Sequence, residues 1–138
     1  MNIATILDMA AEAFGERTAL VCGSTRMSYA ELRAAARHGA GAIRGSKAAY
    51  AALLDVNSPA APVAIFAAAY AGVPYVPLNY RLSRPEINEL VARIAPAYLI
   101  TSGDYHALLD RRDDVQVVDR AAFLDLPESL AADLPEPG

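Results

Sequence analysis

Residues 50–79 read YAALLDVNSPAAPVAIFAAAYAGVPYVPLN, and their pattern gives the clearest indication of the fold. The apolar run Tyr50 to Leu54 predicts a buried strand. Val73 to Leu78 predicts a second strand with irregular ends, because its two prolines lack ladder donors. Between the strands, Asn57-Ser58-Pro59 can cap and open a helix that stops at Gly72. A strand, a helix and a strand joined by short connections indicate parallel pairing through a right-handed crossover.

The same alternation continues after residue 79. Ser83 and Glu86 form a capping box, which predicts a helix that extends to about Ala95, where Pro96 ends it. The pattern then predicts three more elements: a strand from Tyr98 to Thr101, a short helix from Tyr105 to Leu109 and a last strand from Val115 to Val118. The chain is therefore predicted to fold as an α/β unit, a mostly parallel sheet flanked by helices.

The start of the chain has a different pattern, a helix followed by a small hairpin near residues 18–28. A helix is predicted from Ile3 to Phe14, with Gly15 as its stop. Thr18 to Cys22 and Arg26 to Ser28 predict the two strands of the hairpin. The apolar residues of the helix that recur at helical spacing are Ile3, Ile6, Leu7, Ala10 and Phe14.

A second capping box follows the hairpin, at Ser28 and Glu31. It predicts a helix from Tyr29 to about Arg44 that is ended by Gly45. Gly39-Ala40-Gly41 lies inside this helix and is at best half of a dinucleotide-binding fingerprint. Because the fingerprint needs a strand-to-helix turn, close packing between helices is the favoured reason for these glycines.

The length of 138 residues fits one compact domain. From Leu126-Pro127 onward the sequence becomes rich in proline and acidic residues, which is typical of a linker. We therefore expect an α/β subdomain over residues 1–126 and a Pro-rich linker over residues 127–138.

Composition disfavours several classes of function. The formal net charge is −4, which disfavours nucleic-acid binding because that requires concentrated Lys and Arg. The N-terminus lacks a basic segment followed by an apolar run, and no stretch is long and apolar enough to span a bilayer. Cys22 is the only cysteine, which excludes an intrachain disulfide. We expect a cytoplasmic protein without a nucleic-acid partner or a membrane span.

Polar residues after the third strand of the predicted sheet are candidates for catalysis. Thr101-Ser102-Gly103 could cradle a phosphate, but Asp104 would repel the anion and no lysine follows. Ser102, Asp104 and His106 could be drawn as a triad, but no nucleophile elbow is present, so a helix cap by Ser102 or Asp104 is favoured. His38 and His106 are too scattered for a metal site. The sequence therefore predicts no catalytic, cofactor-binding or metal-ligating residue.

Two polar segments, Asn57-Ser58-Pro59 and Pro77 to Arg81, follow the carboxyl ends of predicted strands. Ligands of α/β sheets usually bind at that edge. The same residue types also cap helices and reverse the chain, and residue chemistry alone favours this interpretation. Neither segment identifies a reaction.

Several short segments share an order with a known family. They are Arg17 to Val21, Met27 to Leu32, Asn57-Ser58-Pro59, Ala71 to Asn79, Arg84 to Ile87 and Ala97 to Thr101. Their order and spacing resemble the N-terminal region of the adenylate-forming, AMP-binding acyl-CoA synthetase superfamily. The resemblance covers most of the chain from Phe14 to Thr101, and it implies the N-terminal subdomain of such an enzyme.

The resemblance implies an enzyme that activates a carboxylic acid with ATP and Mg²⁺. An acyl-adenylate forms with release of pyrophosphate, and the thiol of coenzyme A then displaces AMP. The family's phosphate loop and catalytic lysine would lie beyond Gly138. We therefore expect a fragment that has no ligase activity and no bound cofactor, and whose partner is the remainder of its own catalytic domain. The expected substrate is a fatty or other hydrophobic carboxylate.

Two alternatives remain open from the sequence. An acyl-AMP ligase of the same superfamily would load a carrier protein instead of coenzyme A. A stand-alone flavodoxin-like binding or interaction module would need no further residues. If the fragment reading holds, apolar surface that the missing half would cover should cause self-association.

Overall fold

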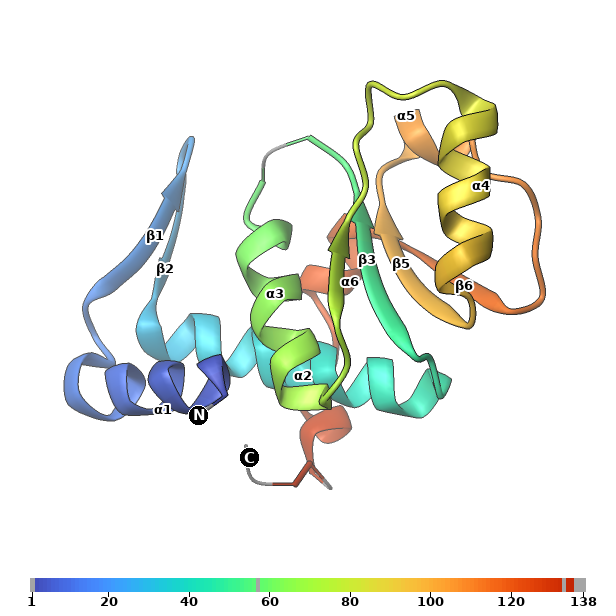
Figure 1. Ribbon diagram of the computed structural model, residues 1–138. Helices are drawn as coiled ribbons and strands as arrows, with labels where there is room; N and C mark the ends of the chain where they lie inside the picture. The colour runs from blue at the N-terminus through green and yellow to red at the C-terminus, as the bar shows by residue number, and fades with distance from the viewer. Residues whose placement is uncertain (1, 57, 133, 136–138) are drawn as a thin grey trace.

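The computed structural model describes residues 2–56, 58–132 and 134–135. A hairpin of β1 (Thr18–Cys22) and β2 (Thr25–Ser28) stands apart from a sheet of β3 (Tyr50–Leu54), β4 (Tyr75–Pro77), β5 (Ala97–Thr101) and β6 (Val115–Asp119) (Figure 1). The helices are α1 (Ile3–Phe14), α2 (Tyr29–Ser46), α3 (Ala60–Ala71), α4 (Arg84–Ile94), α5 (Gly103–His106) and α6 (Arg120–Leu124), and a 3₁₀ helix, η1, spans Glu128–Ala131. No helix in these ranges is both long enough and apolar enough to cross a membrane.

The larger sheet is parallel throughout, in the order β4-β3-β5-β6. This confirms the predicted α/β class and the predicted strand–helix–strand unit. β4 is shorter than the predicted Val73 to Leu78 because Pro74 and Pro77 have no N–H to donate. Its flanking residues still join the ladder, since Ala51 N donates to the Pro74 carbonyl at 3.0 Å and Leu78 N donates to the Leu53 carbonyl at 2.8 Å.

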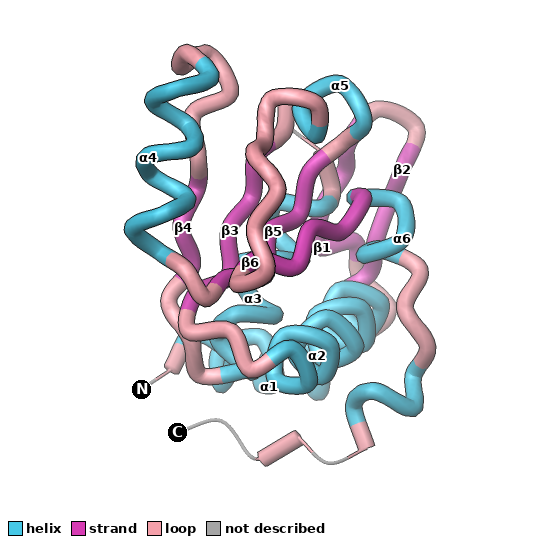
Figure 2. Tube along the Cα trace, turned by 90° about the vertical axis from the view of Figure 1, so that its right-hand side faces the viewer, coloured by secondary structure: helices cyan, strands magenta, loops and turns pink. Residues whose placement is uncertain are grey.

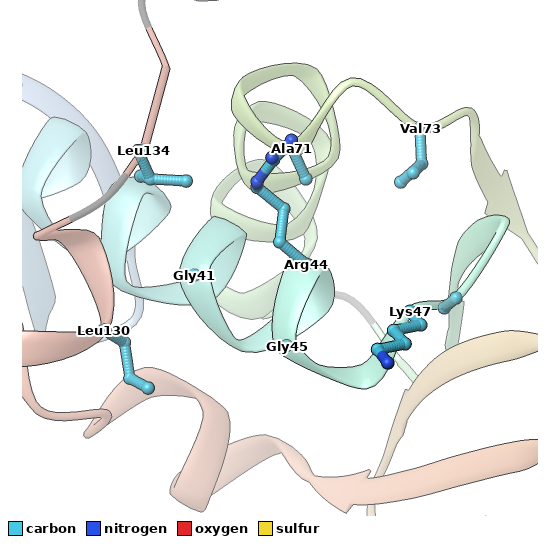
Figure 3. A pocket seen from close by; sticks show the side chains of 9 residues that line it. Gly41, Arg44, Gly45, Lys47, Ala71, Val73, Leu130 and Leu134 are labelled. Atoms are coloured by element: carbon cyan, nitrogen blue, oxygen red, sulfur yellow. The ribbon is translucent and has the colours of Figure 1, made fainter.

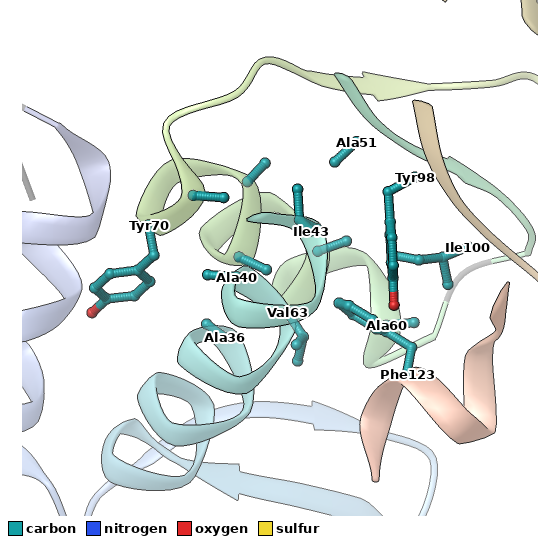
Figure 4. Packing of buried hydrophobic residues seen from close by; sticks show 14 of the residues in the cluster. Ala36, Ala40, Ile43, Ala51, Ala60, Val63, Tyr70, Tyr98, Ile100 and Phe123 are labelled. Atoms are coloured by element: carbon teal, nitrogen blue, oxygen red, sulfur yellow. The ribbon is translucent and has the colours of Figure 1, made fainter. Parts of the chain in front are cut away.

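The two central strands of the sheet, β3 and β5, are buried on both faces, and their alternate residues point to opposite cores. Figure 2 shows α2 and α3 on one side of the sheet and α4 on the other. Ala51 and Leu53 of β3 pack toward α2 and α3, whereas Ala52 and Leu54 pack toward α4. Figure 4 shows the larger core, in which Phe123 of α6 lies beside Tyr98 of β5.

Small residues let α2 approach its neighbours closely. A Cβ on Gly39 would lie 2.8 Å from the Phe123 ring and 3.0 Å from Ala67 Cβ. A Cβ on Gly41 would lie 1.8 Å from the Leu130 carbonyl oxygen. The prediction that Gly39-Ala40-Gly41 serves close packing is therefore confirmed.

Both predicted capping boxes are present. The hydroxyl of Ser28 accepts from Glu31 N at 3.1 Å while the Glu31 carboxylate accepts from Ser28 N at 2.9 Å. Ser83 and Glu86 make the same reciprocal pair at the start of α4. These hydrogen bonds satisfy backbone donors that the first helical turn would otherwise leave unpaired, so both helices begin where the sequence predicts.

Two predicted helix ends are wrong. The helix α2 continues past Gly45 to Ser46, and Lys47, with φ of 60°, takes the left-handed position that we assigned to Gly45. The short helix predicted at Tyr105 to Leu109 instead occupies Gly103–His106. It begins earlier because the Ser102 carbonyl accepts from both Tyr105 N and His106 N.

The first helix has the predicted bounds but a different buried face. Ala4 and Leu7 are buried, whereas Ile3, Ile6 and Phe14 are largely exposed. Near its start, the Asn2 amide donates to the Ala69 carbonyl at 2.9 Å, which brings α1 against α3. The predicted apolar set therefore includes side chains that point outward.

The sequence did not predict α6 or η1. Asp119 caps α6, its carboxylate accepting from Ala121 N at 3.0 Å, so this helix starts directly after the last strand. The 3₁₀ helix lies within the segment that we expected to be a linker, and its Leu130 lies over Gly41 of α2. The boundary between residues 126 and 127 stays a prediction.

Two buried tyrosines should make the chain less stable at alkaline pH. Burial raises the pKa of Tyr98 to about 12. The pKa of Tyr70 is also raised, mainly by burial and to a smaller extent by its hydrogen bond to Asp8. The unfolded chain therefore releases these protons first, so stability present below about pH 10 should fall as the pH rises toward 12. Urea unfolding from neutral to alkaline pH should show a shallower decline for Tyr98→Phe than for the unmodified chain. Parallel declines would contradict this cause.

Candidate functional site

The carboxyl ends of the four parallel strands meet at one edge of the sheet. Asp55 follows β3, Leu78 follows β4, Ser102 follows β5 and Arg120 follows β6. This edge is where an α/β sheet ordinarily binds ligands, so functional side chains are expected here.

An ion pair between Asp55 and Arg120 joins the ends of β3 and β6 at this edge. Arg120 Nη1 lies 3.0 Å from Asp55 Oδ2, across 65 residues of sequence. The Asp55 side chain is fully buried, while that of Arg120 is 37% exposed. The other Asp55 oxygen accepts from Val56 N at 2.8 Å. Asp55 is thus held by one cation and one backbone donor, an arrangement that fixes the end of β3 against the start of α6.

Buried hydroxyls occupy the same edge and are engaged with the backbone. Thr101 Oγ1 donates to the Leu54 carbonyl at 2.7 Å, which joins the ends of β5 and β3. Ser58 Oγ accepts from Ala60 N at 3.2 Å and so caps α3. The structure thus confirms Ser58 in the predicted capping role, while Asn57 lies outside the described residues.

The segment after β4 reverses the chain, as its residue types predicted. Asn79 Oδ1 accepts from Arg81 N at 2.9 Å, which is a local turn made by an asparagine side chain. The Tyr80 ring packs on the Tyr105 ring with centroids 5.4 Å apart, and the Arg81 guanidinium lies 5.6 Å from the Tyr80 centroid. Pro77 to Arg81 therefore forms a folded rim at this edge.

The residues considered for a triad are close in sequence only. Ser102 is buried at the start of α5 and makes no side-chain capping hydrogen bond, while Asp104 and His106 are exposed. Within the described ranges, no hydrogen bond joins the side chains of these three residues. The backbone carbonyl of Ser102, not its hydroxyl, receives the first helical donors.

Sequence reasoning missed Asp55 and Arg120, the charged pair at the centre of the edge. A signal was present, because each is the first charged residue after a strand or its cap. Parallel strands bring such positions to one edge however far apart they are in the sequence. Applying that rule to every strand end would have placed the two together.

The hydrogen bonds and the ion pair described above engage side-chain oxygens at this edge, those of Asp55, Ser58, Asn79 and Thr101. Among the described residues, no group of three or more His, Cys, Asp or Glu could hold a metal ion. The single lysine of the sequence, Lys47, precedes β3 and so lies at the opposite, amino edge. These residues do not fit a site for ATP and Mg²⁺, which needs phosphate donors and carboxylate ligands together.

A hollow of about 540 Å³ lies at the amino edge instead. Figure 3 shows Arg44 extending toward Ala71 at the end of α3, and Lys47 pointing away from it. The remaining lining side chains are small or apolar, Leu130 and Leu134 among them. Because the two cations diverge, the hollow does not form a convergent anion site.

Comparisons with known proteins agree with the fold. A family model described as AMP-binding enzyme matches residues 7–137. The chain is 33% identical over 111 residues to indoleacetate–CoA ligase of Aromatoleum aromaticum. The aligned region covers 78% of this chain and 22% of that protein. It is 37% identical over 94 residues to feruloyl-CoA synthase of an Amycolatopsis species. That aligned region covers 64% of this chain and 18% of that protein.

Solved structures of CoA ligases share this fold. The benzoate CoA ligase of Burkholderia xenovorans superposes with a TM-score of 0.83 at 24% identity, over all of this chain and 31% of that one. A fatty acyl CoA synthetase of Mycobacterium tuberculosis superposes with a TM-score of 0.82 at 25% identity, over 99% of this chain and 30% of that one. The chain spans about a fifth of the length of the curated relatives that it matches. With the parallel sheet, these matches show that the chain belongs to the AMP-binding enzyme family.

Proposed function

We propose that this chain is the N-terminal subdomain of an acyl-CoA synthetase. In the reaction, a carboxylate oxygen attacks the α-phosphate of ATP, giving an acyl-adenylate and pyrophosphate. The sulfur of coenzyme A then attacks the acyl carbon, giving the thioester, AMP and a proton. The observation that carries the proposal is the family match over residues 7–137, together with 33% identity to a CoA ligase.

The proposed substrate is a hydrophobic carboxylic acid, either fatty or aromatic. Support comes from the names of the relatives, which act on indoleacetate and ferulate, and from the structural neighbours, which include a fatty acyl CoA synthetase. All of these acids join an apolar body to a carboxylate. The assay below distinguishes among them.

Within that enzyme we propose a structural role for the chain. Residues 1–126 would form one wall of the catalytic domain, and residues 127–138 would lead toward the rest of it. ATP, Mg²⁺ and coenzyme A would be held by other parts of the protein; for ATP and Mg²⁺ this is supported by the strand-end residues described above, which do not fit them. We also propose a cytoplasmic location, where ATP and coenzyme A are available.

The proposal is tested with the protein in which this chain is followed by its native continuation. Incubation with ATP, Mg²⁺, coenzyme A and single acids, from decanoate to indoleacetate, ferulate and benzoate, should give an ATP-dependent thioester with at least one acid. The 138-residue chain alone should give none. Thioester formation only on a carrier-protein thiol would favour an acyl-AMP ligase. Absence of adenylate with every acid would contradict the proposal.

A further inference from the structure

The outer face of α1 is an apolar surface without a partner among the described residues. α1 lies at one end of the molecule, beside α2 and α3 (Figure 1). Its inner face buries Ala4 and Leu7. On the outer face, Ile3 is 44%, Ile6 55% and Met9 59% exposed. A helix that is apolar on both sides is ordinarily covered on both sides.

The outer residues follow the spacing of a coiled-coil seam. Ile3, Ile6, Ala10 and Ala13 stand at i, i+3, i+7 and i+10, which are consecutive a and d positions of a heptad pattern. Such positions form one stripe along a helix, and in α1 no charged residue occupies any of them. Ile3, Ile6 and Ala13 are exposed, and Ala10 is half-buried. The stripe is therefore presented to a partner.

The sizes of the stripe residues vary in one direction. Large isoleucines occupy the first half of α1 and alanines occupy the second half. In a parallel pair, isoleucine would face isoleucine at one end and alanine would face alanine at the other, so the helices could not pack evenly. In an antiparallel pair, Ile3 of one copy faces Ala13 of the other, and Ile6 faces Ala10, so every layer joins a large residue to a small one.

The charges of α1 favour the same arrangement. The helix has no acidic residue in its first turn and no basic residue in its last turn, and Glu12 stands near its C-terminal end. Within one chain this opposes the helix dipole, which favours acids at the N-terminus. In an antiparallel pair, Glu12 of each copy lies near the N-terminal turn of the other. The partner thus supplies the complementary end that the chain itself lacks.

We propose that two copies of this chain associate through an antiparallel, two-fold pairing of α1 with α1. A two-fold axis brings the same surface of both copies together, and the stripe is complementary to itself only in that orientation. The 12 residues of α1 span about 18 Å. The interface is therefore smaller than that of a stable dimer, and association is weak and dependent on concentration. This inference does not depend on the proposed enzymatic function.

Sedimentation over a concentration series tests the surface. The unmodified chain should shift from monomer to dimer, and Ile6→Glu should raise the dissociation constant by at least about tenfold, because a carboxylate would be buried. Val21→Glu is the matched control, since Val21 is 56% exposed but lies on the hairpin. Equal effects of the two variants would overturn the proposal. So would a chain that stays monomeric throughout, which would indicate that another part of the protein covers α1.

Cross-linking tests the orientation, in a Cys22→Ser background. A chain with Ile3→Cys mixed with a chain with Ala13→Cys should form a disulfide-linked heterodimer under mild oxidation. Either chain alone should cross-link poorly, because an antiparallel pair separates the two copies of residue 3 by about 15 Å along the axis, beyond disulfide reach. Efficient homodimer formation by Ile3→Cys alone would indicate a parallel pair and overturn the proposed geometry. Circular dichroism confirms that each variant keeps the native helix content.

Discussion

Phe123→Ala should destabilise the chain by about 3–5 kcal/mol, the range for emptying a buried phenylalanine site. Phe123 is fully buried in the core between the sheet and α2, with its ring centroid 6.2 Å from that of Tyr98. Gly39 presents only backbone to the ring, so the cavity cannot be filled by a neighbouring side chain from that position. The free energy of unfolding, measured with urea, gives the value directly.

Two further variants separate this cause from a general sensitivity of the core. Ile65→Ala also shortens an apolar side chain, but Ile65 is 36% exposed on α3, so a smaller loss of about 1–2 kcal/mol is expected. Gly39→Ala places a methyl group 2.8 Å from the Phe123 ring and should destabilise the unmodified chain. The same methyl group should cost less in the Phe123→Ala background, where the contact with the ring is gone and only the 3.0 Å contact with Ala67 Cβ remains. Additive effects of Gly39→Ala and Phe123→Ala would contradict the packing described here.

Arg120→Met should destabilise the chain by about 2–3 kcal/mol, below the range for breaking a fully buried pair because Arg120 is partly exposed. The methionine keeps most of the apolar stem but leaves the Asp55 carboxylate, which is fully buried, without its cation. Asp55→Asn should have the smaller effect, because the amide oxygen can still accept from Val56 N and the remaining guanidinium reaches solvent.

The double variant Asp55→Asn/Arg120→Met is the matched control for charge. It contains no uncompensated charge, so it should be more stable than Arg120→Met alone. Chemical denaturation of the four proteins at neutral pH completes the cycle. If the double variant is less stable than Arg120→Met by the full effect of Asp55→Asn, the two side chains do not interact.

Much of the fold followed from local chemistry. Ser28 with Glu31 and Ser83 with Glu86 fixed two helix starts, because a capping box depends only on residues within one turn. The strand–helix–strand unit over residues 50–79 was predicted for a similar reason, since its apolar runs and its glycine stop are local signals. Elements whose boundaries depend on residues close in the sequence, such as these, were therefore predicted well.

Features that depend on tertiary packing were predicted poorly. Five apolar residues of α1 suggested a buried face, but apolar side chains lie on more than one side of this helix, and its position against α2 and α3 selects Ala4 and Leu7 for burial. The pairing of Asp55 with Arg120 spans 65 residues and needs the strand order, which the sequence alone did not provide. The end of α2 was also misplaced: the helix continues through Gly45 to Ser46, and Lys47 adopts the left-handed conformation after it.

We propose that this chain has a structural role and that the rest of its protein holds ATP. ATP–pyrophosphate exchange tests this proposal directly. The 138-residue chain and the same chain with its native continuation are each incubated with ATP, Mg²⁺, labelled pyrophosphate and the acid that the thioester assay selects. We expect acid-dependent exchange by the longer protein and none by the chain alone. Exchange catalysed by the 138 residues themselves, or its absence from the longer protein, would show that adenylation is not divided between the two parts as proposed.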